Sequence, residues 1–216
     1  MAKFHHRKLA TWLKAIQLFS FCSFLLMCYY LFKLQEIAYV GILSFGIITF
    51  FYAMPLLPRN FLPRQQNLRN IGGIKVYLIA FVWSGVTVIL PVMNNYFVID
   101  TYVILTFIQR FIFVIVLMIP FEIRDLRYDS QSLKTIPQKI GLRNTKMMGV
   151  MLLLVFFAIE FFKTNTGKNQ IIVLFILIIT TIWLVVNSRT NQGKYYSSFF
   201  VEGLPILWLL FALLSC

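Results

Sequence analysis

Three carboxylates in one short stretch have the residue type and spacing needed to bind a metal ion. Glu122, Asp125 and Asp129 are three of only seven acidic residues among 216. They follow the apolar run from Phe111 to Pro120 at spacings i, i+3 and i+7, so a continuing helix would carry all three on one stripe. Carboxylates so close together disfavour joint ionisation. A hard cation such as Mg²⁺, which takes oxygen ligands and shares its shell with water and phosphate, removes that conflict.

The same three residues also fit the charged, water-facing end of a membrane helix, which needs no metal. The residues that follow them favour a more specific interpretation. Asp125-x-x-x-Asp129 precedes Lys134-Thr-Ile-Pro137 and then Gly141. This order resembles the second aspartate-rich motif of the UbiA superfamily of membrane prenyltransferases. A second similarity lies upstream, in Tyr52-x-x-Pro55, a basic loop and Trp83-Ser-Gly85.

The resemblance implies a helical membrane enzyme that binds an isoprenyl diphosphate through Mg²⁺. Asp125 and Asp129 would then be the catalytic metal ligands, with Glu122 in support. The isoprenyl group would pass to a lipophilic acceptor, such as an aromatic compound. The candidates for binding the diphosphate oxygens are basic, since Arg and Lys are the usual phosphate partners: Arg124, Arg127, Lys134 and Lys139.

The sequence departs from the family pattern in its first half. The family's first aspartate-rich motif lies at the end of its second helix, but the only acidic residue before Asp100 is Glu36. We therefore expect either that two N-terminal helices are missing, or that this is a short relative with half of the site. The alternative function is a non-catalytic or truncated membrane scaffold or lipid-binding protein of the same fold. A transporter is a third and weaker possibility.

Composition predicts an all-α, polytopic membrane bundle. The chain is 60% hydrophobic and 12% charged, which leaves no room for a separate soluble domain beside its long apolar segments. We predict one transmembrane domain over residues 1–216. The seven expected spans cover residues 12–32, 37–57, 76–93, 98–121, 147–162, 170–186 and 197–214.

The net charge of +13 has a membrane explanation rather than a nucleic-acid one. Sixteen of the 20 lysines and arginines fall in four segments, numbered 1–14, 59–75, 124–146 and 189–194. In a chain of seven spans all four segments lie on one side, which the positive-inside rule assigns to the cytoplasm. The N-terminus is then cytoplasmic and the C-terminus outside. Composition favours a bacterial inner membrane. The basic loop from Arg59 to Lys75 suits either a diphosphate or anionic lipid headgroups.

Two further features are expected to matter inside the membrane. Arg110 lies near the middle of the fourth span, where a charge is costly and normally faces a cavity or a polar partner. We expect it to line a cavity or to pair with a group such as Glu160. Gly41 and Gly46 are predicted points of close helix packing. Gly141 is predicted to end a short helix within the polar segment from Ser130 to Lys146.

Overall fold

The chain folds into helices that are long and apolar enough to cross a membrane. The computed structural model describes residues 2–53, 73–129, 133–163, 167–193 and 195–214, and the side chains within residues 12–213. Helix is the only regular secondary structure in these ranges. Seven spans meet the length and hydropathy of transmembrane helices, as predicted: Trp12–Leu31, Glu36–Ala53, Ile74–Asn94, Thr101–Asp125, Ile136–Glu160, Lys168–Asn187 and Tyr196–Leu213.

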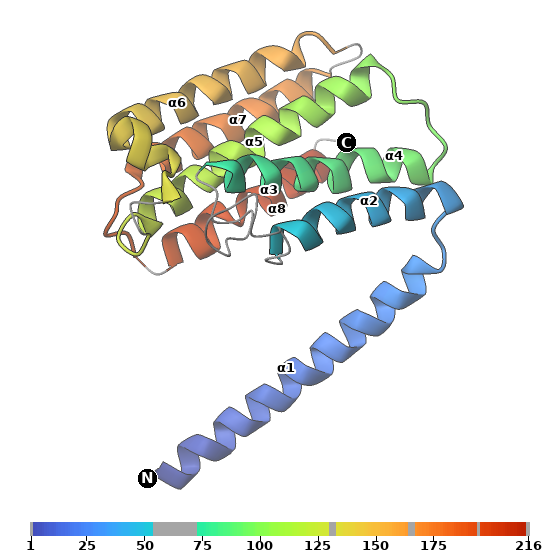
Figure 1. Ribbon diagram of the computed structural model, residues 1–216, viewed down its shortest axis with the longest axis vertical. Helices are drawn as coiled ribbons and strands as arrows, with labels where there is room; N and C mark the ends of the chain where they lie inside the picture. Colours follow the sequence, from blue (N-terminus) through green and yellow to red (C-terminus); the bar gives the residue numbers. More distant parts are fainter. Residues whose placement is uncertain (1, 54–72, 130–132, 164–166, 194, 215–216) are drawn as a thin grey trace, which may run out of the picture.

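Two of these spans are built from more than one of the labelled elements. The third consists of α3, a π-helical turn η2 and α4, and the last consists of η4 and α8 (Figure 1). The elements are α1 (Ala2–Leu31), α2 (Glu36–Ala53), α3 (Ile74–Ser84), η2 (Gly85–Ile89), α4 (Leu90–Asn94), α5 (Thr101–Asp125), α6 (Ile136–Glu160), α7 (Lys168–Asn187), η4 (Tyr196–Val201) and α8 (Leu204–Leu214).

Helix α5 is the centre of the bundle and packs against α3, α6 and α7 (Figure 1). Its core contacts include Phe113, whose ring centroid lies 5.6 Å from that of Phe156 on α6 and 5.3 Å from that of Trp208 on α8. Both aliphatic and aromatic side chains of α5 are fully buried here. The middle of α5 is therefore anchored in the hydrophobic core of the bundle.

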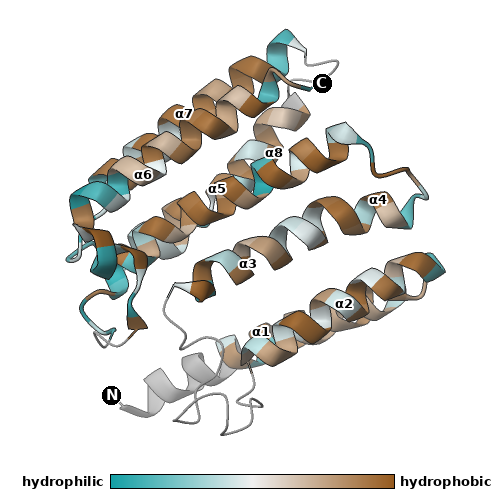
Figure 2. Ribbon diagram, turned by 45° about the horizontal axis from the view of Figure 1, so that its top comes forward, coloured by the Kyte–Doolittle hydropathy of each residue, from teal (hydrophilic) through white to brown (hydrophobic). Residues whose placement is uncertain are grey.

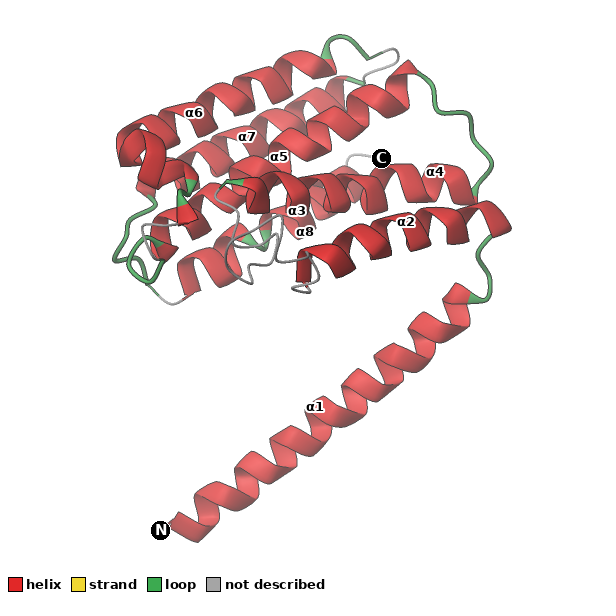
Figure 3. Ribbon diagram, in the orientation of Figure 1, coloured by secondary structure: helices red, strands yellow, loops and turns green. Residues whose placement is uncertain are grey.

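Helix α1 stands apart from this bundle. Figure 3 shows it joined to α2 by a short non-helical link and projecting away from the other helices. None of the residues from Trp12 to Leu31 is buried. Figure 2 shows hydrophobic residues along the helices and hydrophilic residues gathered near their ends, as the interior and surface of a bilayer require.

The ends of two helices differ from the prediction. Helix α5 continues to Asp125 rather than ending near residue 121, so it carries two of the three carboxylates. Helix α6 begins at Ile136 rather than near residue 147. The polar segment from Ser130 to Lys146 is therefore not one long loop.

A capping box explains the early start of α6. The backbone N–H of Thr135 donates to Gln138 Oε1 at 3.0 Å, and Pro137 occupies the first turn, where its missing N–H leaves no hydrogen bond unmade. Gly141 then interrupts the helix at φ 79° and ψ 162°, which confirms that a short helix ends there. Backbone of that kind is almost restricted to glycine.

The two glycines predicted as packing points behave differently. A methyl group on Gly41 would lie 2.9 Å from Leu90 Cδ1, so α2 and α4 approach closely there as predicted. Among the residues that the structure describes, no atom lies within 4 Å of the same position on Gly46, so the predicted close packing is not found there. Gly85, at the start of η2, is another close approach, since a methyl group there would collide with the Phe45 ring. The Tyr52 end of the upstream similarity is described only as far as Ala53, and Arg59 lies outside the described residues.

Candidate functional site

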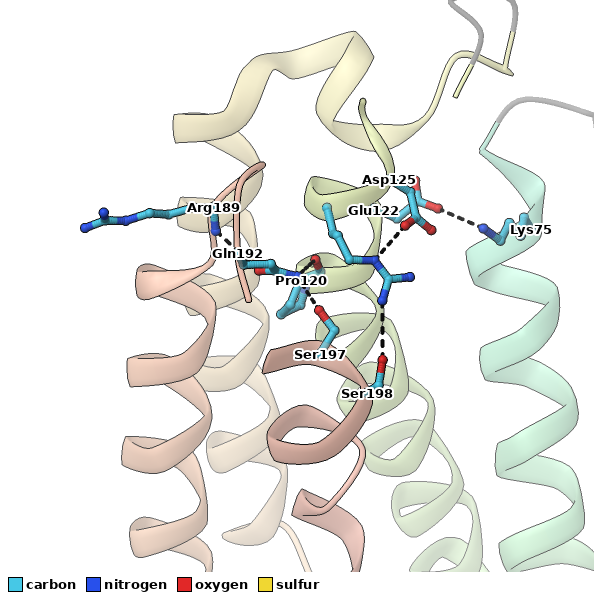
Figure 4. A network of polar contacts seen from close by, with 9 residues as sticks. Lys75, Pro120, Glu122, Asp125, Arg189, Gln192, Ser197 and Ser198 are labelled. Atoms are coloured by element: carbon cyan, nitrogen blue, oxygen red, sulfur yellow. Dashed lines mark hydrogen bonds and ion pairs between the residues drawn. The ribbon is translucent and has the colours of Figure 1, made fainter. Parts of the chain in front are cut away.

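The buried carboxylate of Glu122 is the innermost member of a polar network at the end of α5. Its side chain is 4% exposed, and Lys75 Nζ on α3 lies 3.6 Å from its Oε1 (Figure 4). A carboxylate at this depth requires a positive partner, because burial disfavours an unpaired charge. Lys75 supplies that partner from a helix 47 positions earlier in the sequence.

Arg124 and Asp125 form the next part of the network. Arg124 Nε donates to Asp125 Oδ1 at 2.8 Å, and Nη1 reaches Ser198 Oγ on η4 at 3.5 Å. The guanidinium carbon also lies 5.3 Å from the centroid of the Phe121 ring. The arginine therefore links the acidic end of α5 to the start of the last span.

Gln192 ties the segment before η4 to the same end of α5. Its Nε2 donates to the Pro120 carbonyl oxygen at 3.0 Å and also to Ser197 Oγ (Figure 4). Its Oε1 accepts from the backbone N–H of Arg189 at 3.4 Å. The loop after α7 is thus fixed beside the carboxylates.

The predicted single stripe of three carboxylates is only partly correct. Glu122 and Asp125 lie within α5, but the helix ends at Asp125 and Asp129 follows it in a turn. The backbone N–H of Asp129 donates to the Asp125 carbonyl at 2.9 Å, so one helix-like hydrogen bond still connects them. No group of three or more His, Cys, Asp or Glu side chains is placed to hold a metal in the part of the chain that the structure describes.

The oxygen ligands at this end nevertheless fit one kind of Mg²⁺ site, in which substrate phosphate supplies part of the coordination shell. Glu122, Asp125 and Asp129 offer oxygen ligands only, which Mg²⁺ prefers. One or two protein carboxylates are its usual share when substrate phosphates complete the shell. The arrangement suits an ion held jointly by protein and phosphate, and does not suit a closed cage made of protein alone.

The other predicted basic residues are distributed unevenly. Arg127, Lys134 and Lys139 are exposed, and none forms an ion pair with a carboxylate among the described residues. Lys139 Nζ and the Lys134 carbonyl oxygen both lie beside Gly73, 3.6 and 3.9 Å from where its Cβ would be. The start of α6 therefore meets the start of α3, close to Lys75 in sequence.

Sequence reasoning missed several members of this network. Lys75 was included only as one residue of a basic loop, and Gln192 and Ser198 were not selected. Their spacing to the carboxylates carries no signal, because they reach the site by tertiary packing. The predicted topology was the one available clue, because it places the basic segments 59–75, 124–146 and 189–194 on the same side of the membrane.

A second polar cluster occupies the opposite end of α5. Gln109 Nε2 donates to Glu160 Oε2 at 2.8 Å, and Lys163 Nζ lies 3.1 Å from the same oxygen. Lys163 Nζ also donates to Gln109 Oε1 at 2.5 Å. All three side chains are buried. Polar groups at such depth are satisfied by one another, as burial demands.

Arg110 lies next to this cluster and lines a cavity with it. Its guanidinium carbon lies 4.1 Å from the centroid of the Trp208 ring. It forms no ion pair with Glu160, which pairs with Lys163 instead. The sequence left two alternatives for Arg110, a cavity or a polar partner such as Glu160, and in the structure this side chain borders a cavity.

Comparisons with protein-family models, with curated proteins and with solved structures find no match to this chain.

Proposed function

We propose that this chain is a UbiA-like integral membrane prenyltransferase. It would transfer an isoprenyl group from its diphosphate to a lipophilic acceptor, such as an aromatic compound, in a Mg²⁺-dependent reaction. One observation carries the proposal. Carboxylates and cations from three separate elements converge at one end of the central helix: Glu122 and Asp125 on α5, Lys75 on α3, and Lys139 at the start of α6.

The roles follow from charge and position. Asp125 and Asp129, supported by Glu122, would hold Mg²⁺, which when bound neutralises a diphosphate and assists its departure. Arg124, Arg127, Lys134 and Lys139 remain the candidates for the diphosphate oxygens, and Lys75 joins them. Arg124 and Lys75 already lie against carboxylates, so an arriving diphosphate would compete for cations that are in place.

The reaction balances without a further reactant. The allylic carbon–oxygen bond breaks, its electron pair leaves with the diphosphate, and the acceptor forms the new bond and loses a proton. The apolar side chains of the surrounding helices would exclude water from the cation formed in this step. The positive charge of this cation would be stabilised by the carboxylates of the network, which the lipid interior cannot supply.

The alternative function is a non-catalytic membrane scaffold or lipid-binding protein of the same fold. One observation favours it. Glu36 is the only acidic residue before Asp100, and it begins α2 at the end of the bundle opposite to Glu122 (Figure 1). Among the residues with a described position, no second carboxylate motif faces the network. A single motif would bind one Mg²⁺–diphosphate without completing the two-motif chemistry.

We also propose that the network end faces the cytoplasm of a bacterial inner membrane. The described basic residues that precede α6 and follow α7 lie at this end of the bundle, together with Lys75. This arrangement gives a cytoplasmic N-terminus and a C-terminus outside by the positive-inside rule. Anionic lipids of the inner leaflet would then meet the same basic end.

Binding of a labelled isoprenyl diphosphate to the detergent-solubilised protein tests the proposal. We expect Mg²⁺-dependent binding, and we expect the affinity to fall at least tenfold in the double variant Asp125→Ala, Asp129→Ala. The matched control is Glu36→Gln, which removes an exposed acidic charge at the opposite end and should bind as wild type does. Binding that ignores both EDTA and the double substitution would remove the metal role.

Release of diphosphate separates the two functions. A prenyltransferase releases diphosphate when an acceptor is present, and the release should stop in the double variant. A scaffold binds the labelled donor and releases none. Both measurements use the same purified protein, so a folding defect would appear in each as loss of a monodisperse elution peak.

A further inference from the structure

A cavity of about 690 Å³ lies at the end of the bundle opposite to the network, between α5, α6, α7 and α8. Arg110, which lines it, precedes Glu122 by 12 positions, about 18 Å along a straight helix. The cavity is therefore separate from the proposed diphosphate site. Its volume is within the range of pockets that hold small organic ligands.

The acidic member of this cavity is already neutralised. Glu160 lines the cavity, but Lys163 Nζ lies 3.1 Å from its Oε2, and the two side chains are only 1% and 4% exposed. Gln109 donates to the same carboxylate oxygen. Glu160 therefore balances Lys163 and leaves the other cations of the cavity without a carboxylate.

Arg110 is one of the cations that remain. All seven acidic side chains of the chain belong to the part that the structure describes, and none of the ion pairs found there includes Arg110. Its Nε is buried and has no hydrogen-bond partner among the described residues. The Trp208 ring covers the guanidinium at 4.1 Å, which lowers the cost of burial but supplies no negative charge.

The other residues that line the cavity form a positively charged part and an apolar part. Lys168, at the start of α7, adds a second positive charge at the rim. Val173, Leu174 and Leu209 add an apolar wall that leads away from the charges. A ligand that matches both parts has a negative group at one end and an apolar chain at the other.

We propose that this cavity binds an anionic amphiphile, with its carboxylate or phosphate at Arg110 and its chain along the apolar wall. A fatty carboxylate and an anionic phospholipid share this chemistry. An anion here satisfies the partly buried guanidinium, which a membrane interior otherwise penalises. Planar guanidinium groups bind such oxyanions through two parallel hydrogen bonds. The site works without Mg²⁺ and does not depend on the proposed transfer reaction.

Trp208 provides a direct readout, because it touches the guanidinium that would hold the anion. In the full chain, Trp12, Trp83 and Trp183 are replaced by Phe, which leaves Trp208 as the one emitting tryptophan. The probes are dibromostearate, dibromo-phosphatidylglycerol and dibromo-phosphatidylcholine, whose bromines quench nearby tryptophan. We expect saturable quenching by at least one of the two anionic probes and little by the zwitterionic one. The anionic probe that acts identifies the source of the ligand.

Two variants and one control test the role of the charge. Arg110→Gln should weaken the quenching at least tenfold, and Arg110→Lys should retain most of it. Lys33→Gln is the matched control, because Lys33 also lies over an aromatic ring, 4.6 Å from the Tyr29 centroid, but outside the cavity. In the Lys33→Gln variant, the anionic probe should quench Trp208 as strongly as it does in the chain without this substitution.

Competition on the unmodified chain keeps the test independent of folding in the variants. Labelled oleate bound to wild-type protein should be displaced by unlabelled oleate and not by oleyl alcohol, which has the same chain and no charge. Equal displacement by the alcohol would overturn the proposal. Equal quenching by the zwitterionic lipid, or unchanged quenching in folded Arg110→Gln, would overturn it as well.

Discussion

Lys75 Nζ lies 3.6 Å from Glu122 Oε1 and joins the first turn of α3 to the last turn of α5. The lysine is 26% exposed and the glutamate 4%, so the contact crosses from the bundle surface to its interior. One charge pair between residues more than forty positions apart therefore sets the register of α3 against α5. The proposed site depends on this registration, because it sets where the carboxylates lie relative to α3.

Removing the lysine tests that registration. Lys75→Met leaves the Glu122 carboxylate buried without its cation, and we expect a loss of about 2 kcal/mol in unfolding free energy. Thermal unfolding in detergent measures it as a lower midpoint. The double variant Lys75→Met, Glu122→Gln should recover most of the loss, since it buries no unpaired charge. Equal stability of the single variant and the wild type would show that the pair does not hold the helices together.

The seven spans were predictable because hydropathy summed over about twenty residues is a strong signal. The end of α5 and the start of α6 were harder to predict. The run through Pro120 suggested an earlier end, but the helix continues to Asp125. The Thr135 and Gln138 pair is a capping signal that the sequence analysis did not use.

The site was predictable only in its acidic part. Spacing along one segment selected Glu122 and Asp125, and the structure brings both to one helix end. It does not keep Asp129 on the same helix. Lys75, Gln192 and the Glu160–Lys163 pair depend on contacts between helices, and no local pattern carries that information.

The backbone at Gly141 gives a second prediction. Gly141→Ala should destabilise the protein by about 1–3 kcal/mol, because φ 79° with ψ 162° is strained for any residue with a side chain. Gly46→Ala is the control, since Gly46 lies within α2 with open space around it. Alanine there should be neutral or stabilising by up to about 1 kcal/mol. Thermal unfolding of both variants checks the difference, and equal behaviour would contradict the backbone argument.

The Glu160–Lys163 pair gives a third prediction. Glu160→Gln leaves a nearly fully buried lysine without its carboxylate, and loss of one partner of such a pair costs about 3–5 kcal/mol. Glu202→Gln makes the same chemical change at an exposed position and should alter stability by less than about 0.5 kcal/mol. Denaturation curves of the two variants measure both effects. A similar small change in each would show that Lys163 does not need its carboxylate.

The central claim is that the end of α5 is a Mg²⁺-dependent diphosphate site. Titration of a labelled isoprenyl diphosphate into wild-type protein, with and without Mg²⁺, tests it most directly. We predict at least tenfold tighter binding with Mg²⁺, reversed by EDTA and competed by inorganic diphosphate. Binding to a folded protein that is unaffected by Mg²⁺, or no binding at all, would contradict the claim and leave the scaffold function in its place.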